Sequence, residues 1–204
     1  MNKALFFING EEPSKIPQNI NEYSLIACTD GAYSRYVYKF QLKIDFISGD
    51  FDSLIQEQVP QGITLISTPD QNKTDFHKAL ELLVERRITQ VDVYGATGRE
   101  SDHFIGNLST ALYFKNKLKI TFYDDYSKFF FSNHKTHLTN VKGKIISLIP
   151  FFKAENIQTQ GLQYPLNNEP LCLPERIGTR NKAIDECVTI EYSNGELLIY
   201  ISNS

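Results

Sequence analysis

The first 125 or so residues repeat one arrangement, in which a short apolar run ends in a cluster of Gly, Asp, Ser or Thr. A helix-like stretch often follows the cluster. Continuous runs rich in β-branched residues are typical of strands that are buried on both faces of a sheet. Strands that alternate with helices predict an open parallel sheet. The expected strands are 4–8, 23–28, 44–48, 63–67, 91–94 and 118–123.

Two helices are expected to begin directly after such clusters. Thr74 precedes Asp75 and the stretch FHKALELLVERR, whose apolar residues recur on one helical face. Thr74 can cap the free amides, and Asp75 places negative charge in the first turn, where it is favoured. Ser101 precedes Asp102 and HFIGNLSTALYFKN in the same way. Each helix is therefore predicted to open at a Ser–Asp or Thr–Asp pair.

Aspartates gather where the expected strands end. Ligands of an open parallel sheet bind beyond the carboxyl ends of its strands, so these side chains should converge on one crevice. Several carboxylates repel one another unless a cation joins them, and Mg²⁺ is typically shared with substrate phosphates. The helix N-termini and the segment GATG supply amides for phosphate oxygens. This edge therefore suggests Mg-nucleotide chemistry, carried by Asp30, Asp50, Asp52, Asp75 and Asp102, with Lys73, Lys78 and Arg99 as nearby cations.

A purely structural reading has about equal weight for any single one of these aspartates, because Asp is favoured in turns and first helical turns. Asp50 and Asp52 are harder to explain in that way. Alternate residues of an extended segment point to the same side, so both carboxylates would face one region. No Cys/His spacing supports a zinc site.

The helix pattern stops near residues 124–128, and short apolar runs with turn signals take over. Such spacing predicts a small antiparallel sandwich, with a hairpin at the turn 193–195 joining the last two runs. The expected fold is α/β, with an open parallel-sheet nucleotide-binding domain over residues 1–125 and an all-β sandwich over 126–204. The runs are 128–132, 135–138, 144–152, 157–159, 188–192 and 197–201.

Composition narrows the class of protein and its partners. The 204 residues carry a formal charge of −3, which argues against a general affinity for nucleic acid or anionic membrane. No run approaches the roughly 20 apolar residues of a membrane span. Cys28, Cys172 and Cys187 have neither CxxC spacing nor the density of a disulfide framework. We therefore expect a cytoplasmic protein in a reducing compartment.

Seven motifs, in order, resemble those of the thiamine pyrophosphokinase family. In the first domain they are DGA (30–32), GDFDS (49–53), DQNKTDF (70–76) and GATGRESDH (95–103). In the second they are KGKIISLIP (142–150), GLQYPL (161–166) and GTRN (178–181). The resemblance implies transfer of a pyrophosphoryl group from ATP to the thiamine hydroxyl, which gives thiamine diphosphate and AMP and requires Mg²⁺. It also implies that the β-sandwich helps to hold thiamine, and a homodimer with the site between subunits.

With this resemblance, each motif residue receives a hypothetical role. Asp102 orients or deprotonates the thiamine hydroxyl, and Asp30 adds an outer-sphere contact to the metal. The candidate Mg²⁺ ligands are Asp50, Asp52 and Asp75; the candidate phosphate-binding residues are Gln71, Thr74, Lys78 and Arg99; and the candidate thiamine contacts are Thr179 and Asn181.

Three departures from the family pattern bear on these roles. Glu100 stands where the family has Arg, and Arg99 lies one place early. Asn72 replaces a carboxylate. The chain has no Trp to stack on thiamine, which leaves Tyr164 and Phe152 as aromatic candidates.

Two rival functions stay open. One is a Mg-dependent phosphohydrolase that uses the pair Asp50 and Asp52, with one Asp as nucleophile. Such enzymes need an apolar strand that runs directly into the first Asp, and Gly49 intervenes here, which counts against this function. The other is a non-catalytic module that binds nucleotide or thiamine, for which the altered Arg99–Glu100 loop is the best support.

Overall fold

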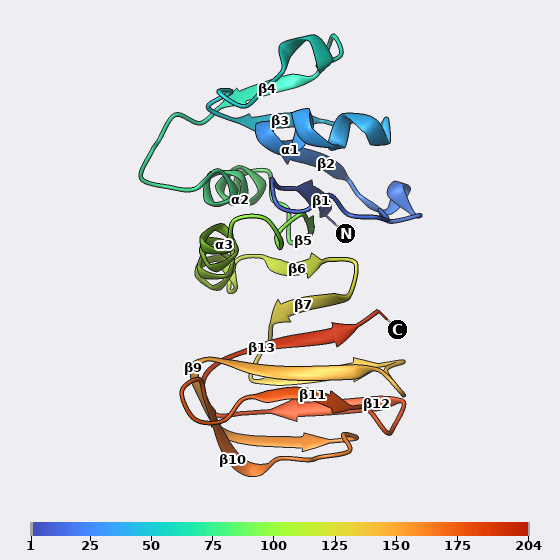
Figure 1. The fold of residues 1–204 in the computed structure, drawn as a ribbon, viewed down its shortest axis with the longest axis vertical. Coiled ribbons are helices and arrows are strands. Elements are labelled where there is room, and N and C mark those ends of the chain that lie inside the picture. The colour runs from blue at the N-terminus through green and yellow to red at the C-terminus, as the bar shows by residue number, and fades with distance from the viewer. Residues whose placement is uncertain (1, 204) are drawn as a thin grey trace. The chain divides into compact units, whose positions relative to one another are not determined.

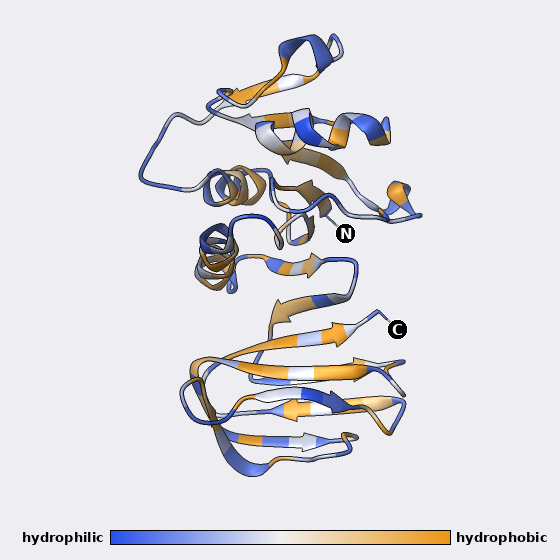
Figure 2. Cartoon of the chain, viewed as in Figure 1, coloured by the Kyte–Doolittle hydropathy of each residue, from blue (hydrophilic) through white to orange (hydrophobic). Residues whose placement is uncertain are grey.

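The computed structural model describes residues 2–203 and divides the chain into two compact units, residues 1–125 and 126–204 (Figure 1). Together they form a mixed α/β fold, with helices in the first unit and strands in both. Figure 2 shows that the strands are largely hydrophobic and the connecting loops largely hydrophilic. Among the described residues, no helix is long and apolar enough to cross a membrane.

The first unit is built on parallel strands in the order β4-β3-β2-β1-β5-β6. Each expected strand of this unit is confirmed to within two residues at either end. The strands are β1 (Lys3–Phe7), β2 (Leu25–Thr29), β3 (Phe46–Gly49), β4 (Thr64–Ser67), β5 (Gln90–Tyr94) and β6 (Lys119–Tyr123).

Burial on both faces holds for β1, β2, β3 and β5, whose residues are almost all inaccessible to solvent. It is wrong for β4, in which three of the four residues are exposed. The reason is position, because β4 stands at the end of the strand order and, among the described residues, pairs only with β3. An apolar run such as TLIS does not reveal whether its strand is central or at the edge.

Helices cover both faces of this sheet. The strand side chains of Phe7, Cys28 and Ile47 pack with α1 (Asp30–Arg35), whereas Phe76 of α2 (Asp75–Glu85) contacts Phe122 of β6. Since Phe122 and its neighbour Tyr123 point to opposite faces, α2 lies on the face away from α1. The remaining helices are α3 (Ser101–Phe114), which packs beside α2, and the short 3₁₀ turns Ile20–Glu22, Val37–Phe40 and Gln56–Gln58.

The second unit consists of antiparallel strands arranged around one long strand, β9, which pairs with β10, β11, β12 and β13. The expected runs 144–152 and 157–159 merge into this single strand. The strands are β7 (Ser127–Phe131), β8 (Lys135–Thr139), β9 (Ile145–Gln160), β10 (Asn167–Cys172), β11 (Gly178–Lys182), β12 (Cys187–Glu191) and β13 (Asn194–Ser202). Apolar patterning does not predict β10 or β11, because they are rich in polar residues and at least half of the residues of each strand are exposed.

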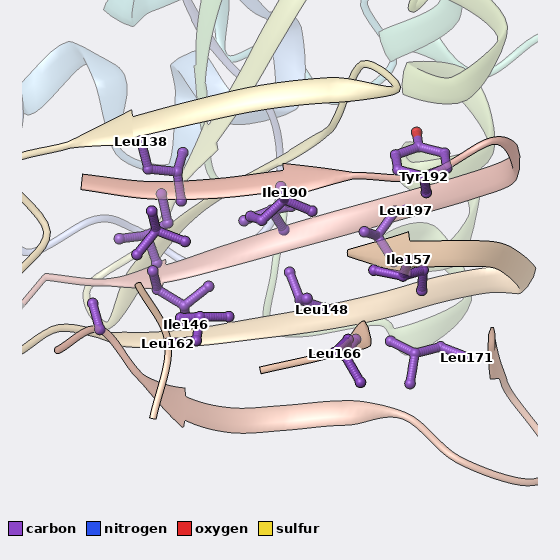
Figure 3. Close-up of a cluster of buried hydrophobic side chains, with 14 of the residues drawn as sticks. Leu138, Ile146, Leu148, Ile157, Leu162, Leu166, Leu171, Ile190, Tyr192 and Leu197 are labelled. Atoms are coloured by element: carbon purple, nitrogen blue, oxygen red, sulfur yellow. The ribbon is translucent and has the colours of Figure 1, made fainter. Parts of the chain in front are cut away.

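The core of this unit is a cluster of aliphatic side chains from several strands (Figure 3). Along β9 the buried positions are even-numbered as far as Ala154 and odd-numbered from Ile157. The switch coincides with Asn156, whose φ of 54° lies in the left-handed region, and with a shift in the register of the β10 pairing. An irregularity of this kind re-aims the side chains, so that both halves of β9 contribute to one core.

The expected hairpin between the last two strands is wrong. Within residues 2–203, β12 pairs with β8 and β9, whereas β13 pairs with β7 and β9, and the two strands do not pair with each other. Gly195 serves a different purpose from a hairpin turn. Its φ is 87°, and a Cβ at this position would lie 2.0 Å from the Lys153 carbonyl oxygen, so Gly permits the close approach to β9.

Candidate functional site

A cavity of about 420 Å³ lies in the first unit, beside the carboxyl ends of its central strands and the start of α2. This is the edge at which the sequence predicts a ligand crevice. The lining residues are Ile8, Asn9, Gly10, Thr29, Asp50, Gln71, Asn72, Lys73, Thr74, Asp75, Phe76, Lys78, Ala96, Gly98, Arg99, Glu100, His103 and Asn107.

The start of α2 forms one wall of the cavity. Thr74 is its N-cap, as predicted, and its Oγ1 accepts a hydrogen bond of 3.2 Å from the His77 amide. Asp75 opens the first turn and lies 2.9 Å from Nζ of Lys78. The Lys78 ammonium also donates to the Thr68 carbonyl at 2.6 Å. Lys78 is only 6% exposed although it lines the cavity, so its charge is held at a defined place.

The segment after β3 differs from the expected extended conformation. Phe51 has a φ of 70°, and the Asp52 amide donates to Oδ1 of Asp50 at 3.2 Å. The chain therefore turns at Phe51, and Asp50 and Asp52 are not alternate residues of a strand. Asp50 lines the cavity, with Gln71 Nε2 3.5 Å from its Oδ2, whereas Asp52 is exposed and does not line it.

Asp30 opens α1 and is buried, with only 3% of its surface exposed. Its carboxylate accepts hydrogen bonds from the amides of Gly31 at 2.7 Å and Phe51 at 2.9 Å. Burial raises the pKa of Asp30 above its ordinary value, and the charges of Asp75 and Asp50 raise it further, against the effect of the two amides. Gly49 leaves room for this carboxyl group, because a Cβ there would lie 2.4 Å from Asp30 Cγ.

The loop between β5 and α3 forms the opposite wall. Arg99 lines the cavity with a φ of 57°, and its Nη1 donates to Oδ1 of Asn9 at 3.1 Å. The helix α3 begins at Ser101, next to Asp102 as predicted, and Glu100 is the N-cap position, without a side-chain cap bond. Asp102 is exposed, accepts from the His103 amide at 2.9 Å, and does not line the cavity.

The cavity thus brings together seven of the predicted residues and leaves three others of this unit outside its lining. Asp30 lies buried outside the lining, and Asp52 and Asp102 are exposed. The residues inside are Asp50, Gln71, Lys73, Thr74, Asp75, Lys78 and Arg99.

Sequence reasoning missed several polar residues of the lining, chiefly Asn9, Thr29 and Asn107. Asn9 and Thr29 each end or follow an apolar run. A polar residue at the end of an apolar run is the signal that identified the aspartates, so the same signal could have identified Asn9 and Thr29. Asn107 lies within α3, and its Nδ2 donates to the Ala96 carbonyl at 3.0 Å. A residue inside a helical pattern carries no comparable signal.

The second unit holds Thr179 and Asn181 on β11. The Asn181 side chain makes two hydrogen bonds to the neighbouring segment 161–166. Its Oδ1 accepts from the Tyr164 amide at 3.1 Å, and its Nδ2 donates to the Tyr164 carbonyl at 2.6 Å. Tyr164 is 67% exposed and lies between the buried residues Leu162 and Leu166. Asn181 therefore fixes the backbone that presents an exposed aromatic ring.

No three Asp, Glu, His or Cys side chains within residues 2–203 lie close enough together to hold a metal ion by themselves. Two carboxylates of the cavity lining, Asp50 and Asp75, each raise the pKa of Asp30 by their charge. Oxygen ligands of this kind suit Mg²⁺, which usually takes one or two carboxylates and completes its shell with water and phosphate oxygens. The donor set fits a metal that arrives with a polyphosphate.

Comparisons with known proteins match both units to the same family. Residues 16–122 match the family described as "Thiamin pyrophosphokinase, catalytic domain", and residues 132–197 match "Thiamin pyrophosphokinase, vitamin B1 binding domain". Thiamine pyrophosphokinase 1 of Oryza sativa subsp. japonica is 26% identical over 98% of this chain and 86% of its own length. Thiamine pyrophosphokinase of Bacillus subtilis is 26% identical over 74% of this chain and 75% of its own length.

Solved structures show the same fold. The crystal structure of a thiamin pyrophosphokinase family protein from Enterococcus faecalis covers 100% of both chains with a TM-score of 0.85 at 22% identity. Because one family match alone spans residues 16–122, more than half of the chain, the assignment does not depend on these distant structures. The chain belongs to the thiamin pyrophosphokinase family.

Proposed function

We propose that this chain is a thiamine pyrophosphokinase that transfers a pyrophosphoryl group from ATP to the thiamine hydroxyl and releases AMP. The observation that carries the proposal is the cavity, in which Asp50, Asp75 and Lys78 stand beside the N-terminus of α2. Carboxylates for a metal, a buried ammonium and free helix amides are the groups that a polyphosphate requires. A second unit that matches a vitamin B1 binding domain supports thiamine as the acceptor.

Phosphate binding follows from the start of α2. The first amides of a helix have no partner within it and attract anions. Thr74 accepts from His77 through its oxygen, which leaves the hydroxyl proton free to donate to a phosphate. Gln71 lies between this turn and Asp50, and Arg99 reaches the cavity from the opposite wall. These residues bind and orient the polyphosphate, and orientation is the larger part of catalysis in phosphoryl transfer.

Asp50 and Asp75 would hold Mg²⁺, which when bound supplies charge neutralisation on the phosphates. Asp30 already accepts two backbone hydrogen bonds, which suits an outer-sphere role. We retain Asp52 as the third carboxylate that would hold Mg²⁺. This role requires the backbone turn at Phe51 to change conformation. Removal of the metal with EDTA is therefore expected to abolish product formation.

Asp102 is the proposed group that orients or deprotonates the thiamine hydroxyl. The oxygen then attacks the β-phosphorus, the bond between the α- and β-phosphates breaks, and AMP leaves. Asp102 is exposed on the first turn of α3, and the adjacent residue His103 lines the cavity. Replacing Asp102 with Asn should slow turnover by about 10²–10⁴-fold, the range for a general base, while Mg-ATP still binds.

For thiamine, we propose Thr179 as a direct contact and Asn181 as the residue that positions Tyr164. Replacing Asn181 with Ala removes both hydrogen bonds to the Tyr164 backbone. At about 1 kcal/mol each, the two bonds correspond to a KM for thiamine raised roughly 30-fold, with the KM for ATP unchanged. Hydrogen exchange of the Gln163 and Tyr164 amides should become faster.

Asn167→Ala, an exposed change on the neighbouring strand β10, is the control and should alter neither quantity. A normal KM for thiamine in the Asn181→Ala protein, with faster exchange of the loop, would show that Tyr164 is not part of the thiamine site.

Incubation with ATP, Mg²⁺ and thiamine, followed by separation of the nucleotides, tests the function. AMP and thiamine diphosphate in equal amounts support it. Phosphate released without thiamine favours the rival phosphohydrolase, and ATP binding without AMP favours a non-catalytic binding module.

We also propose a cytoplasmic homodimer. The family resemblance supports the dimer, and the free thiols of Cys28, Cys172 and Cys187 support a reducing compartment. If the site forms between subunits, mixing an Asp75→Asn protein with an Asn181→Ala protein should restore activity above that of either alone. Light scattering coupled to size exclusion gives the mass directly, and a monomeric active enzyme contradicts the dimer.

A further inference from the structure

Three buried hydroxyl groups in the first unit have no hydrogen-bond partner among the described residues. They belong to Thr29 at the end of β2, Ser48 in β3 and Thr68 just after β4. Thr29 is 3% exposed and Ser48 is 1% exposed. Buried polar groups in folded proteins are nearly always paired, so each exception needs an explanation.

The three hydroxyls belong to adjacent parts of the sheet, near its carboxyl edge. Thr29 is the register partner of Ser48 in the β2–β3 pairing, and the Thr68 amide donates to the Gly49 carbonyl at 2.8 Å. Cys28 and Ile47 pack on the α1 side, so Thr29 and Ser48, one residue further along, face α2. Lys78 of α2 donates to the Thr68 carbonyl on this same side.

Thr29 differs from the other two because it lines the cavity, together with Asp75 and Lys78. Its Oγ1 is shielded from solvent as it now lies. The residue already forms part of the cavity wall, so rotation about the Cα–Cβ bond is the movement that would bring its hydroxyl to the cavity surface.

An unpaired buried hydroxyl is unfavourable for the folded protein, and Val or Ala at the same place would avoid that cost. Residues that weaken stability without a local gain are typical of functional sites. The groups around Thr29 indicate that the ligand is an anion. Lys78 and the start of α2 both attract negative charge. The nearby Asp75 carboxylate is paired with Lys78, which reduces its repulsion of an anion.

We propose that Thr29 is a ligand-binding residue whose hydroxyl donates a hydrogen bond to a phosphate oxygen of the bound polyphosphate chain. The inference rests on the proposed function, in which this cavity takes ATP. Because the acceptor is charged, the bond strengthens binding by more than a neutral hydrogen bond would.

The test is Thr29→Val, which keeps the shape of the side chain and removes the hydroxyl. Calorimetry with inorganic pyrophosphate and Mg²⁺ should show a Kd roughly 10-fold higher than that of the wild type. The Tm should be equal or higher, since an unpaired hydroxyl is gone. Thr29→Ser should retain the wild-type affinity, and the affinity for adenosine, which has no phosphate, should not change in either variant.

Ser48→Ala is the matched control, because it removes the same kind of buried unpaired hydroxyl from a residue that does not line the cavity. It should leave the pyrophosphate affinity unchanged. Two results would overturn the role of Thr29: a wild-type pyrophosphate affinity in Thr29→Val, or an equally weakened affinity in Ser48→Ala. If the wild type still produces AMP and thiamine diphosphate, either result leaves the proposed function intact. A wild-type chain that binds no pyrophosphate overturns the proposed function as well.

Discussion

Replacing Asp75 with Asn is expected to lower kcat/KM for AMP formation roughly 10³-fold, the size of effect seen when one preorganised electrostatic partner is lost. Asp75 lines the cavity at the first position of α2, and its carboxylate lies 2.9 Å from Lys78 Nζ. The amide variant loses the negative charge that would hold Mg²⁺, and Lys78 loses its anionic partner. The fold should survive, because Asp75 is only partly buried and Thr74 still caps the helix.

Asp70→Asn is the control for charge. It removes one negative charge from the same edge, but Asp70 does not line the cavity and an amide oxygen can still accept from the Asn72 amide. Its kcat/KM should stay within a few-fold of the wild type. Near wild-type turnover in Asp75→Asn, measured with saturating Mg²⁺ and an unchanged circular dichroism spectrum, would refute the role of Asp75.

Replacing Lys78 with Met should impair both stability and activity. Lys78 is the buried ammonium of the cavity, and its loss leaves the Thr68 carbonyl without this donor. A fully buried carbonyl without a donor costs about 1–3 kcal/mol in the free energy of unfolding. The Thr68 carbonyl is partly buried, so we expect a loss near the lower end of this range. The loss of a fixed positive charge beside the phosphates should lower kcat/KM about 10²–10³-fold. Urea titration and an assay of AMP formation measure the two effects separately.

Lys39→Met is the matched control, since Lys39 forms an exposed ion pair with Glu12 at 2.7 Å away from the cavity lining. It should change neither quantity by much, because exposed pairs contribute little. A Lys78→Met protein that is destabilised but fully active at low temperature would restrict Lys78 to a structural role.

Much of the first unit could be predicted from the sequence, because a buried parallel strand is a continuous apolar run and its end is marked by polar residues. Thr74 could be predicted as a cap from its place before Asp75 and an amphipathic stretch. The second unit was harder. Polar strands such as β11 carry no apolar signal, and the partners of β13 are β7 and β9 rather than the strand that precedes it.

Some residues of the candidate site could likewise be predicted from the sequence, and others could not. Residue types at strand ends and helix starts predicted Asp50, Asp75 and Lys78, since these positions are local in the chain. The turn at Phe51, which separates Asp52 from Asp50, depends on a hydrogen bond from the Phe51 amide to Asp30, 21 residues away. Local spacing cannot reveal a backbone conformation that a distant carboxylate stabilises.

By itself, the sequence determined the parallel-sheet unit, the edge at which its polar residues gather and the family resemblance of both units. These features depend on short-range patterns of burial, capping and motif. Only the tertiary structure decided that Thr29 lines the cavity and has an unpaired buried hydroxyl, that Lys78 is buried and donates to the Thr68 carbonyl, and that Asn181 holds the Tyr164 backbone. Each of these depends on which strands and loops become neighbours, and hydrogen-bond partners are chosen only once that packing exists.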